Sequence, residues 1–181
     1  MLKRDNASPN LKAEPEMNPR PPLPCPHEKP APVVSTIRPD QIDAAVKLFG
    51  VQMKEHHIEI GLEKVRGVIE QVIGDDRRGF ILVATTAEGE VVGAAFASAF
   101  LGMEHGGVSG WLEELYVLPS WRGMQIGSKL VSEVVRLAKT RGWRALDLEI
   151  EADHGRVASL YQRYGFLPHS RSRFYRKLVH E

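Results

Sequence analysis

This chain has a single cysteine, almost no net charge and no long apolar run. Cys25 has no possible partner within the chain, so no internal disulfide can form, and a reducing cytoplasm is the simplest location. The formal net charge of +1 argues against non-specific nucleic-acid binding, which needs a basic surface. No segment approaches the roughly 18–20 apolar residues of a membrane span. We therefore expect a cytoplasmic protein with no nucleic-acid or membrane partner.

Proline is scarce in most of the chain and concentrated near its start. Nine of the twelve prolines lie between Pro9 and Pro32, where few apolar residues recur. Such a stretch buries too little surface to offset the entropy lost on ordering, and proline favours extended conformations. We predict a disordered proline-rich arm over residues 1–31 and one folded domain over 32–181. Docking of the arm on a neighbouring subunit or in an aromatic groove is the alternative.

The rest of the chain predicts alternating strands and helices. Apolar residues recur at helical spacing in four segments, 42–53, 62–73, 126–138 and 157–164. Strands are expected at residues 33–37, 79–86, 90–100, 111–118, 145–150 and 172–179. This order indicates an α/β domain without internal repeats.

The segment from Leu112 to Leu130 is the most informative part of the sequence. It is typical of a strand, a tight turn and a glycine-bearing loop that enters a helix. Unpaired N–H groups and the positive end of the helix dipole form an anion site there. Gly123 and Gly127 lack the third glycine of a dinucleotide fingerprint, and Gly127-Ser128-Lys129 has the wrong order for a Walker loop. The loop predicts a phosphorylated ligand, most often a nucleotide or coenzyme.

The same segment resembles the coenzyme signature V-x-P-x-x-R-G-x-G-I-G-x-x-L of the GNAT superfamily of acetyl-CoA-dependent N-acetyltransferases. The matching residues are Val117, Pro119, Arg122, Gly123, Ile126, Gly127 and Leu130. The order β-α-α-β-β-β-α-β-α-β is similar to the whole GNAT fold. The resemblance implies a single GNAT-like domain with a mixed, mostly antiparallel central sheet flanked by about four helices. Gln125 departs from the signature, because a glycine normally stands there.

The resemblance also implies acetyl-CoA as co-substrate and no metal. The coenzyme-binding residues are expected in three places: the strand before the loop, the loop itself, and the position where the family has an asparagine and this chain has a histidine. They are Leu115, Tyr116, Val117, Arg122, Gly123, Met124, Gln125, Ile126, Gly127, Ser128 and His154.

Acetyl transfer to an amine needs a group that removes a proton, and Glu113 and Glu114 lie on the strand that leads to the loop. In GNAT enzymes that act on amino sugars and polyamines, the first acidic residue of a similar pair is the usual choice, which matches Glu113. Strand alternation sends the two to opposite faces unless a bulge intervenes. The alternative is that both are solvated or ion-paired carboxylates.

The departing thiolate also needs a proton, and Tyr161 is the candidate acid. Residues 155–166 resemble the family motif N-x-x-A-x-x-L-Y-x-x-x-G-F, whose tyrosine hydroxyl reaches the coenzyme sulfur. Tyr161 also fits the apolar stripe of its helix, so a core tyrosine is the alternative.

These residues predict an N-acetyltransferase that uses direct ternary-complex transfer, because no credible nucleophile for a covalent intermediate is present. The acceptor is a small-molecule or peptide amine, and the acidic residues, Asp147, Glu149 and Glu151 among them, suggest a cationic one. Glu55 or His57 could contact it; the adjacent histidines 56 and 57 diverge on a helix and do not indicate a metal. A noncatalytic acetyl-CoA sensor or regulatory module is the alternative function. An interaction role for the arm and a homodimer stay open.

Overall fold

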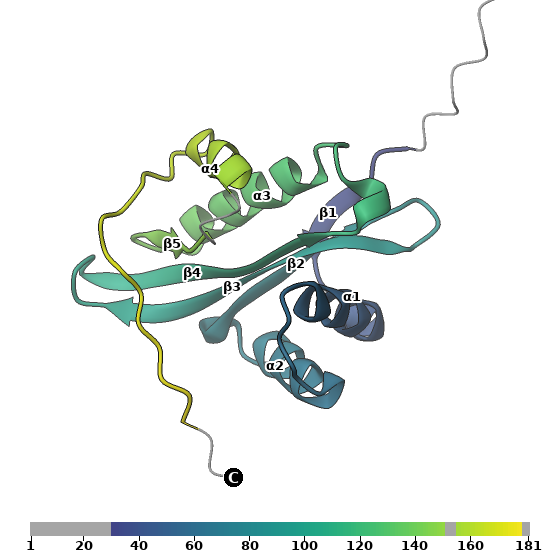
Figure 1. Cartoon of the computed structure of the whole chain (residues 1–181), viewed down its shortest axis with the longest axis horizontal. Coiled ribbons are helices and arrows are strands. Elements are labelled where there is room, and N and C mark those ends of the chain that lie inside the picture. Colours follow the sequence, from purple (N-terminus) through teal and green to yellow (C-terminus); the bar gives the residue numbers. More distant parts are fainter. Residues whose placement is uncertain (1–29, 151–154, 179–181) are drawn as a thin grey trace, which may run out of the picture.

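The fold is a five-stranded sheet with helices on both faces (Figure 1). The structure is a computed structural model that describes residues 30–150 and 155–178. Most of the predicted arm, residues 1–29, and the predicted coenzyme ligand His154 lie outside the described residues. The predicted α/β class and the mixed, mostly antiparallel sheet are confirmed.

The strands lie in the order β1-β2-β3-β4-β5. The first four pair antiparallel, and β4 and β5 pair parallel. They are β1 (Val33–Thr36), β2 (Gly79–Thr85), β3 (Val91–Gly102), β4 (Gly107–Val117) and β5 (Leu146–Leu148). The sheet therefore follows chain order, and only the crossover through α3 (Ile126–Thr140) brings a parallel strand to its edge.

Two separate hydrophobic cores hold the helices against the sheet. Helices α1 (Ile42–Glu55) and α2 (Leu62–Gly74) cover one face, where Phe49 and Ile69 pack against β2 and β3. Helices α3 and α4 (Gly155–Gln162) cover the other face, where Leu130 and Val134 are fully buried. Figure 1 shows the two helix pairs on opposite sides of the sheet. Short 3-10 turns join these elements at Pro39–Gln41, Asp76–Arg78 and Pro119–Trp121.

Helix α1 ends in a Schellman motif. The N–H of Ile58 donates to the carbonyl of Met53, and the N–H of His57 donates to the carbonyl of Lys54. His57 adopts φ 55°, the left-handed conformation that this motif requires. His57 therefore has a structural task at this helix end.

Strand β4 begins four residues before the predicted start at Trp111. Two glycines weaken the strand signal there, yet residues 107–110 pair with residues 99–102 of β3. A Cβ on Gly110 would lie 2.0 Å from the Trp143 ring, so the close approach of the α3–β5 connection requires glycine at this position.

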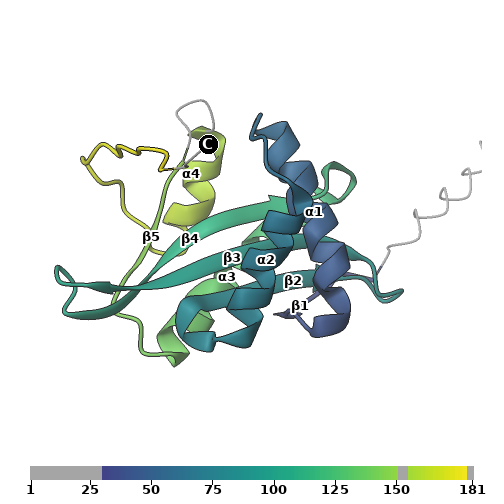
Figure 2. The same cartoon turned by 90° about the horizontal axis from the view of Figure 1, so that it is seen from below.

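Strand β5 is shorter than the predicted segment 145–150, and it meets only Gly110, Trp111 and Leu112 of β4. Strand β5 ends at Leu148, whereas β4 continues beyond Leu112 towards the 3-10 turn at Pro119 (Figure 2). Residues 113–117 of β4 therefore have a strand partner only on the β3 side within the described chain. That unpaired edge is where an extended ligand can add.

The predicted strand at 172–179 is wrong over residues 172–178, the part that the structure describes, because they form no strand. Ion pairs hold this part of the chain instead: Arg171, just before the segment, contacts Glu104 at 2.7 Å, and Arg173 within it contacts Glu149 at 2.5 Å. Arg173 also lies 5.0 Å from the centre of the Trp111 ring. These contacts hold the segment at the end of the sheet, where it has no neighbouring strand to pair with among the described residues.

Candidate active site

A β-bulge in β4 brings both candidate carboxylates to the same face of the sheet. Glu114 pairs with Phe96 and Leu112 pairs with Ala97, so Glu113 is the extra residue. The bulge changes the alternation: Leu112 packs in the core under α3, and Tyr116 packs in the core under α1 and α2. Glu114 therefore lies on the α1 side with Tyr116.

Glu113 lies on this face as well. Its Oε1 accepts a hydrogen bond of 2.7 Å from the hydroxyl of Ser98. Ser98 alternates with Phe96 and Ala94, which contact the core under α1 and α2. The two carboxylates are consequently neighbours, and the negative charge of Glu113 raises the pKa of Glu114.

Glu114 has an environment suited to accepting a proton near neutral pH. Burial raises the pKa of its carboxyl to about 7, and the charge of Glu113 adds to the shift. A hydrogen bond of 2.5 Å from Nε2 of Gln52 opposes that shift, because it favours the ionised form. Gln52 is only 5% exposed, and its Oε1 is buried without a hydrogen-bond partner in the part of the chain that the structure describes.

A third carboxylate, Glu55, lies one helical turn beyond Gln52 on α1. Its Oε1 accepts a hydrogen bond of 2.5 Å from the Tyr116 hydroxyl, and its Oε2 lies 2.9 Å from Nη2 of Arg122. These contacts, Tyr116 foremost, lower the pKa of Glu55. Unlike Glu114, Glu55 is thus held as a carboxylate at neutral pH.

Arg122 is fixed by three contacts at the start of the predicted phosphate loop. Besides the Glu55 pair, its Nε donates to the carbonyl of Val117 at 2.9 Å. Its guanidinium lies 5.3 Å from the centre of the Tyr116 ring. Arg122 therefore links α1, β4 and the loop.

The loop itself presents a run of unpaired backbone donors. Within the described chain, the N–H groups from Gly123 to Ser128 have no hydrogen-bond partner, and the first helical bond of α3 is made by Lys129. Gly123 has φ 81° and open space at its Cβ position. Gln125 adopts φ 61°, the left-handed conformation that favours the glycine of the GNAT signature. The predicted loop residues thus lie together at one helix N-terminus.

Tyr161 lies on the opposite face, in the core under α3 and α4. It is 9% exposed, its ring meets Phe166 edge-on at 5.8 Å, and its hydroxyl has no hydrogen-bond partner among the described residues. Burial raises the pKa of the Tyr161 phenol to about 12, so it is protonated at neutral pH.

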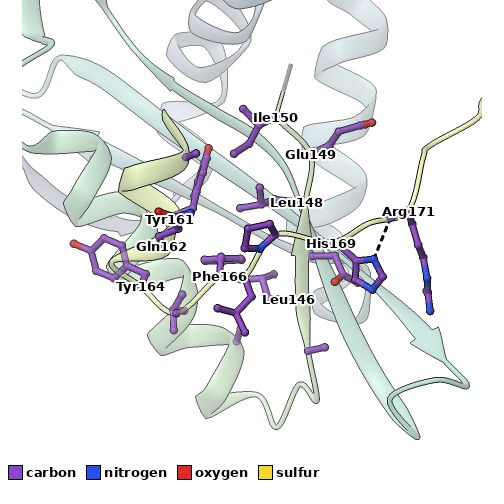
Figure 3. A pocket seen from close by; sticks show the side chains of 18 of the residues that line it. Leu146, Leu148, Glu149, Ile150, Tyr161, Gln162, Tyr164, Phe166, His169 and Arg171 are labelled. Carbon is purple, nitrogen blue, oxygen red and sulfur yellow. Dashed lines mark hydrogen bonds between the residues drawn. The ribbon is translucent and has the colours of Figure 1, made fainter. Parts of the chain in front are cut away.

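Tyr161 also lines a hollow of about 1050 Å³. Figure 3 shows Tyr161 and Phe166 on the α4 side of this hollow and Leu146, Leu148 and Ile150 on the β5 side. Residues 113–128 do not line it. The hollow therefore begins at Tyr161 and extends away from the carboxylates of β4.

Several residues from the sequence analysis lie apart from this site. Asp147 lies 4.0 Å from His105, and Glu149 pairs with Arg173 near the C-terminal segment.

Among the described residues, no group of three or more His, Cys, Asp or Glu side chains could hold a metal ion. Within those same residues, no helix is long and apolar enough to cross a membrane.

Comparison with known proteins agrees with this arrangement. The model of the acetyltransferase (GNAT) family matches residues 45–166. The chain belongs to the GNAT family. No curated protein matches its sequence.

Solved structures share the GNAT fold. An integron cassette protein from the mobile metagenome of Cole Harbour Salt Marsh is 22% identical and covers 82% of this chain and 91% of its own, with a TM-score of 0.72. Aminoglycoside N-acetyltransferase AAC(6')-Iy, solved with CoA, is 21% identical and covers 81% and 95%, with a TM-score of 0.67. A possible acetyltransferase from Clostridium difficile 630 is 15% identical and covers 83% and 99%, with a TM-score of 0.70.

In this GNAT chain, sequence reasoning missed two side chains of the site. Gln52 was not among the predicted site residues, and Tyr116 was predicted only as a coenzyme-binding residue, whereas its hydroxyl contacts Glu55. The spacing of three residues places Gln52 and Glu55 on one face of a helix. It does not reveal that Gln52 contacts Glu114, 62 residues away, or that Glu55 contacts Arg122, 67 residues away.

Proposed function

We propose that this GNAT protein transfers the acetyl group of acetyl-CoA to a primary amine by direct transfer in a ternary complex. The observation that carries the proposal is the bulge at Glu113, which places two carboxylates on the strand that runs into the phosphate loop. The six unpaired N–H groups from Gly123 to Ser128 support a diphosphate site at the N-terminus of α3. The unpaired edge of residues 115–117 supports pairing with the amides of the pantetheine arm.

Glu114 is the base in this proposal. A lysine-like amine has a pKa of about 10.4, so passing its proton to a carboxylate of ordinary pKa costs about 8 kcal/mol. With the Glu114 pKa at about 7, the same transfer costs about 5 kcal/mol. Glu114 takes this proton, directly or through a water, before the neutral amine nitrogen attacks the thioester carbonyl. The attacking nitrogen loses its second proton to solvent as the intermediate collapses, and solvent returns a proton to Tyr161 after it has protonated the thiolate. Glu113 keeps the pKa of Glu114 high through its charge.

Tyr161 is the acid. As the carbon–sulfur bond breaks, its hydroxyl donates a proton to the thiolate. A pKa of about 12 makes donation to a thiolate of pKa ~8.5 uphill by roughly 5 kcal/mol. A buried thiolate has a raised pKa for the same reason as the phenol, and this narrows the gap.

The acceptor in this proposal is a cationic amine. The carboxyl groups of Glu113 and Glu114 give the α1–β4 seam a negative charge, which attracts an ammonium group. The neighbours AAC(6')-Iy and meta-AAC0020 are aminoglycoside acetyltransferases, and meta-AAC0020 was solved with sisomicin. Aminoglycosides and polyamines are therefore the first amines to test.

The test is a thiol-release screen over diverse amines, corrected for acetyl-CoA hydrolysis. The proposal requires at least one amine to accelerate thiol release and an acetylated product of the expected mass. Coenzyme binding without thiol release for any amine would instead support a noncatalytic acetyl-CoA sensor. The feature that favours this second function is Gln125, whose side chain stands where the family has bare backbone.

Location and assembly complete the proposal. The single cysteine and the use of acetyl-CoA support a cytoplasmic enzyme. Exposed apolar side chains at Leu101 and Met103 of the β3–β4 hairpin support a homodimer. Light scattering on the purified chain tests the assembly.

A further inference from the structure

Glu55 forms an ion pair with Arg122, the cation that the coenzyme diphosphate would attract. Arg122 directly precedes the loop of unpaired N–H groups, and its Nη2 is committed to Glu55 Oε2 at 2.9 Å. The Tyr116 hydroxyl fixes the other carboxylate oxygen at 2.5 Å. The carboxylate thus lies between the coenzyme loop and the α1–β4 seam where Glu114 lies.

We propose that Glu55 and the coenzyme diphosphate compete for Arg122, so that binding of the coenzyme releases Glu55 to bind the cationic acceptor. This inference rests on the proposed function, because it assumes that the loop binds the diphosphate. A guanidinium binds phosphate in a bidentate manner, and a diphosphate carries more charge than one carboxylate. The Arg122 side chain is half exposed, and turning it towards the loop gives up its contacts with Glu55, the Val117 carbonyl and the Tyr116 ring, which the charge of the diphosphate has to offset.

The exchange gives an order to the reaction. While Glu55 is bound to Arg122, its charge is compensated and it attracts an ammonium group weakly. Once the diphosphate holds Arg122, the charge of Glu55 is no longer compensated by the guanidinium, and the Tyr116 hydroxyl still orients the carboxylate. By linkage, a cationic acceptor that binds Glu55 also favours the diphosphate at Arg122. Glu55 is therefore a positioning residue that couples the two substrates.

The proposal predicts that removing Glu55 strengthens coenzyme binding, whereas a residue that merely supports the site would weaken it. Coenzyme A is titrated calorimetrically into the full chain, into Glu55→Gln and into Glu55→Asp. Breaking an exposed ion pair of this kind changes an equilibrium constant by a factor of about two to five. The affinity of Glu55→Gln for coenzyme A should therefore rise by that factor. Glu55→Asp keeps the charge but is too short for both of its present contacts, so its affinity should rise by about twofold.

Glu133→Gln is the matched control. It removes the same charge from an ion pair with Arg136 on α3, away from the loop, and should leave coenzyme A affinity unchanged. Melting temperatures of all variants show that they are folded. Equal or weaker binding by Glu55→Gln would overturn the exchange while leaving the proposed function intact. No binding of coenzyme A to any form would overturn both.

Discussion

The two faces of the sheet place the proposed proton-transfer groups in different surroundings. On the α1 face, burial raises the pKa of Glu114 most, the charge of Glu113 raises it further, and His56 and the hydrogen bond from Gln52 lower it. On the α3 face, Tyr161 has apolar neighbours, and burial alone raises its pKa. The proposed base is thus shifted by neighbouring groups in addition to burial, whereas the proposed acid is shifted by burial alone. Substitutions should therefore act differently on the two faces.

The largest effect is expected for Glu114→Gln, which removes the base and keeps the shape. Loss of a positioned general base lowers turnover by about 10²–10⁴. In steady-state assays, the loss should be greatest near pH 7 and smaller at higher pH, where more acceptor amine is already neutral. Glu113→Gln should cost less, because that residue acts on Glu114 through its charge. A larger effect of Glu113→Gln would assign the base to Glu113, the residue that the family pattern favours.

A loss of about 10² in kcat is expected for Tyr161→Phe. The ring keeps its contact with Phe166, and coenzyme affinity should be nearly unchanged. An acyl donor with a more acidic leaving thiol should restore the rate, because that thiolate departs without a proton. Wild-type turnover would instead show that Tyr161 serves only the core.

A shift in the pH profile, with a smaller loss of rate, is expected for Gln52→Leu. The Gln52 amide favours ionised Glu114, so its removal should raise the Glu114 pKa further above 7. The acidic limb of kcat/KM should then move to higher pH by about one unit. An unmoved limb would show that Gln52 does not act on the base.

The smallest effect concerns stability. A carboxyl whose folded pKa is raised destabilises the fold as pH rises from its ordinary value to about 7. Glutamine does not titrate, so Glu114→Gln should gain melting temperature relative to the wild type as pH increases from 4.5 to 8. A difference that stays constant over this range would contradict the raised pKa.

Gln125→Gly tests the departure from the family signature. Glycine adopts the left-handed conformation of residue 125 at no steric cost, so coenzyme affinity should be equal or better in calorimetry. A large loss of affinity would mean that the Gln125 side chain contacts the coenzyme.

Periodicity in the sequence was sufficient for the helices and for the strands that carry continuous apolar alternation. It could not reveal the bulge at Glu113, because a bulge depends on how β4 matches β3, not on the residues of β4 alone. The same limit applies to Glu55 and Arg122, which meet only because α1 packs beside β4. The predicted strand over residues 172–178 is wrong for the converse reason. Their sequence suits a strand, but the ion pairs of Arg171 with Glu104 and of Arg173 with Glu149 hold this part of the chain in another path.

The central claim is that Glu114 is the base, poised near neutral pH by burial and by Glu113. The most direct test is a carboxyl carbon NMR titration of the glutamates in the full chain, with the Glu114 signal assigned from its absence in Glu114→Gln. The account predicts a Glu114 midpoint near pH 7 that falls in Glu113→Gln. A midpoint between about 4 and 5, unchanged in Glu113→Gln, would contradict it.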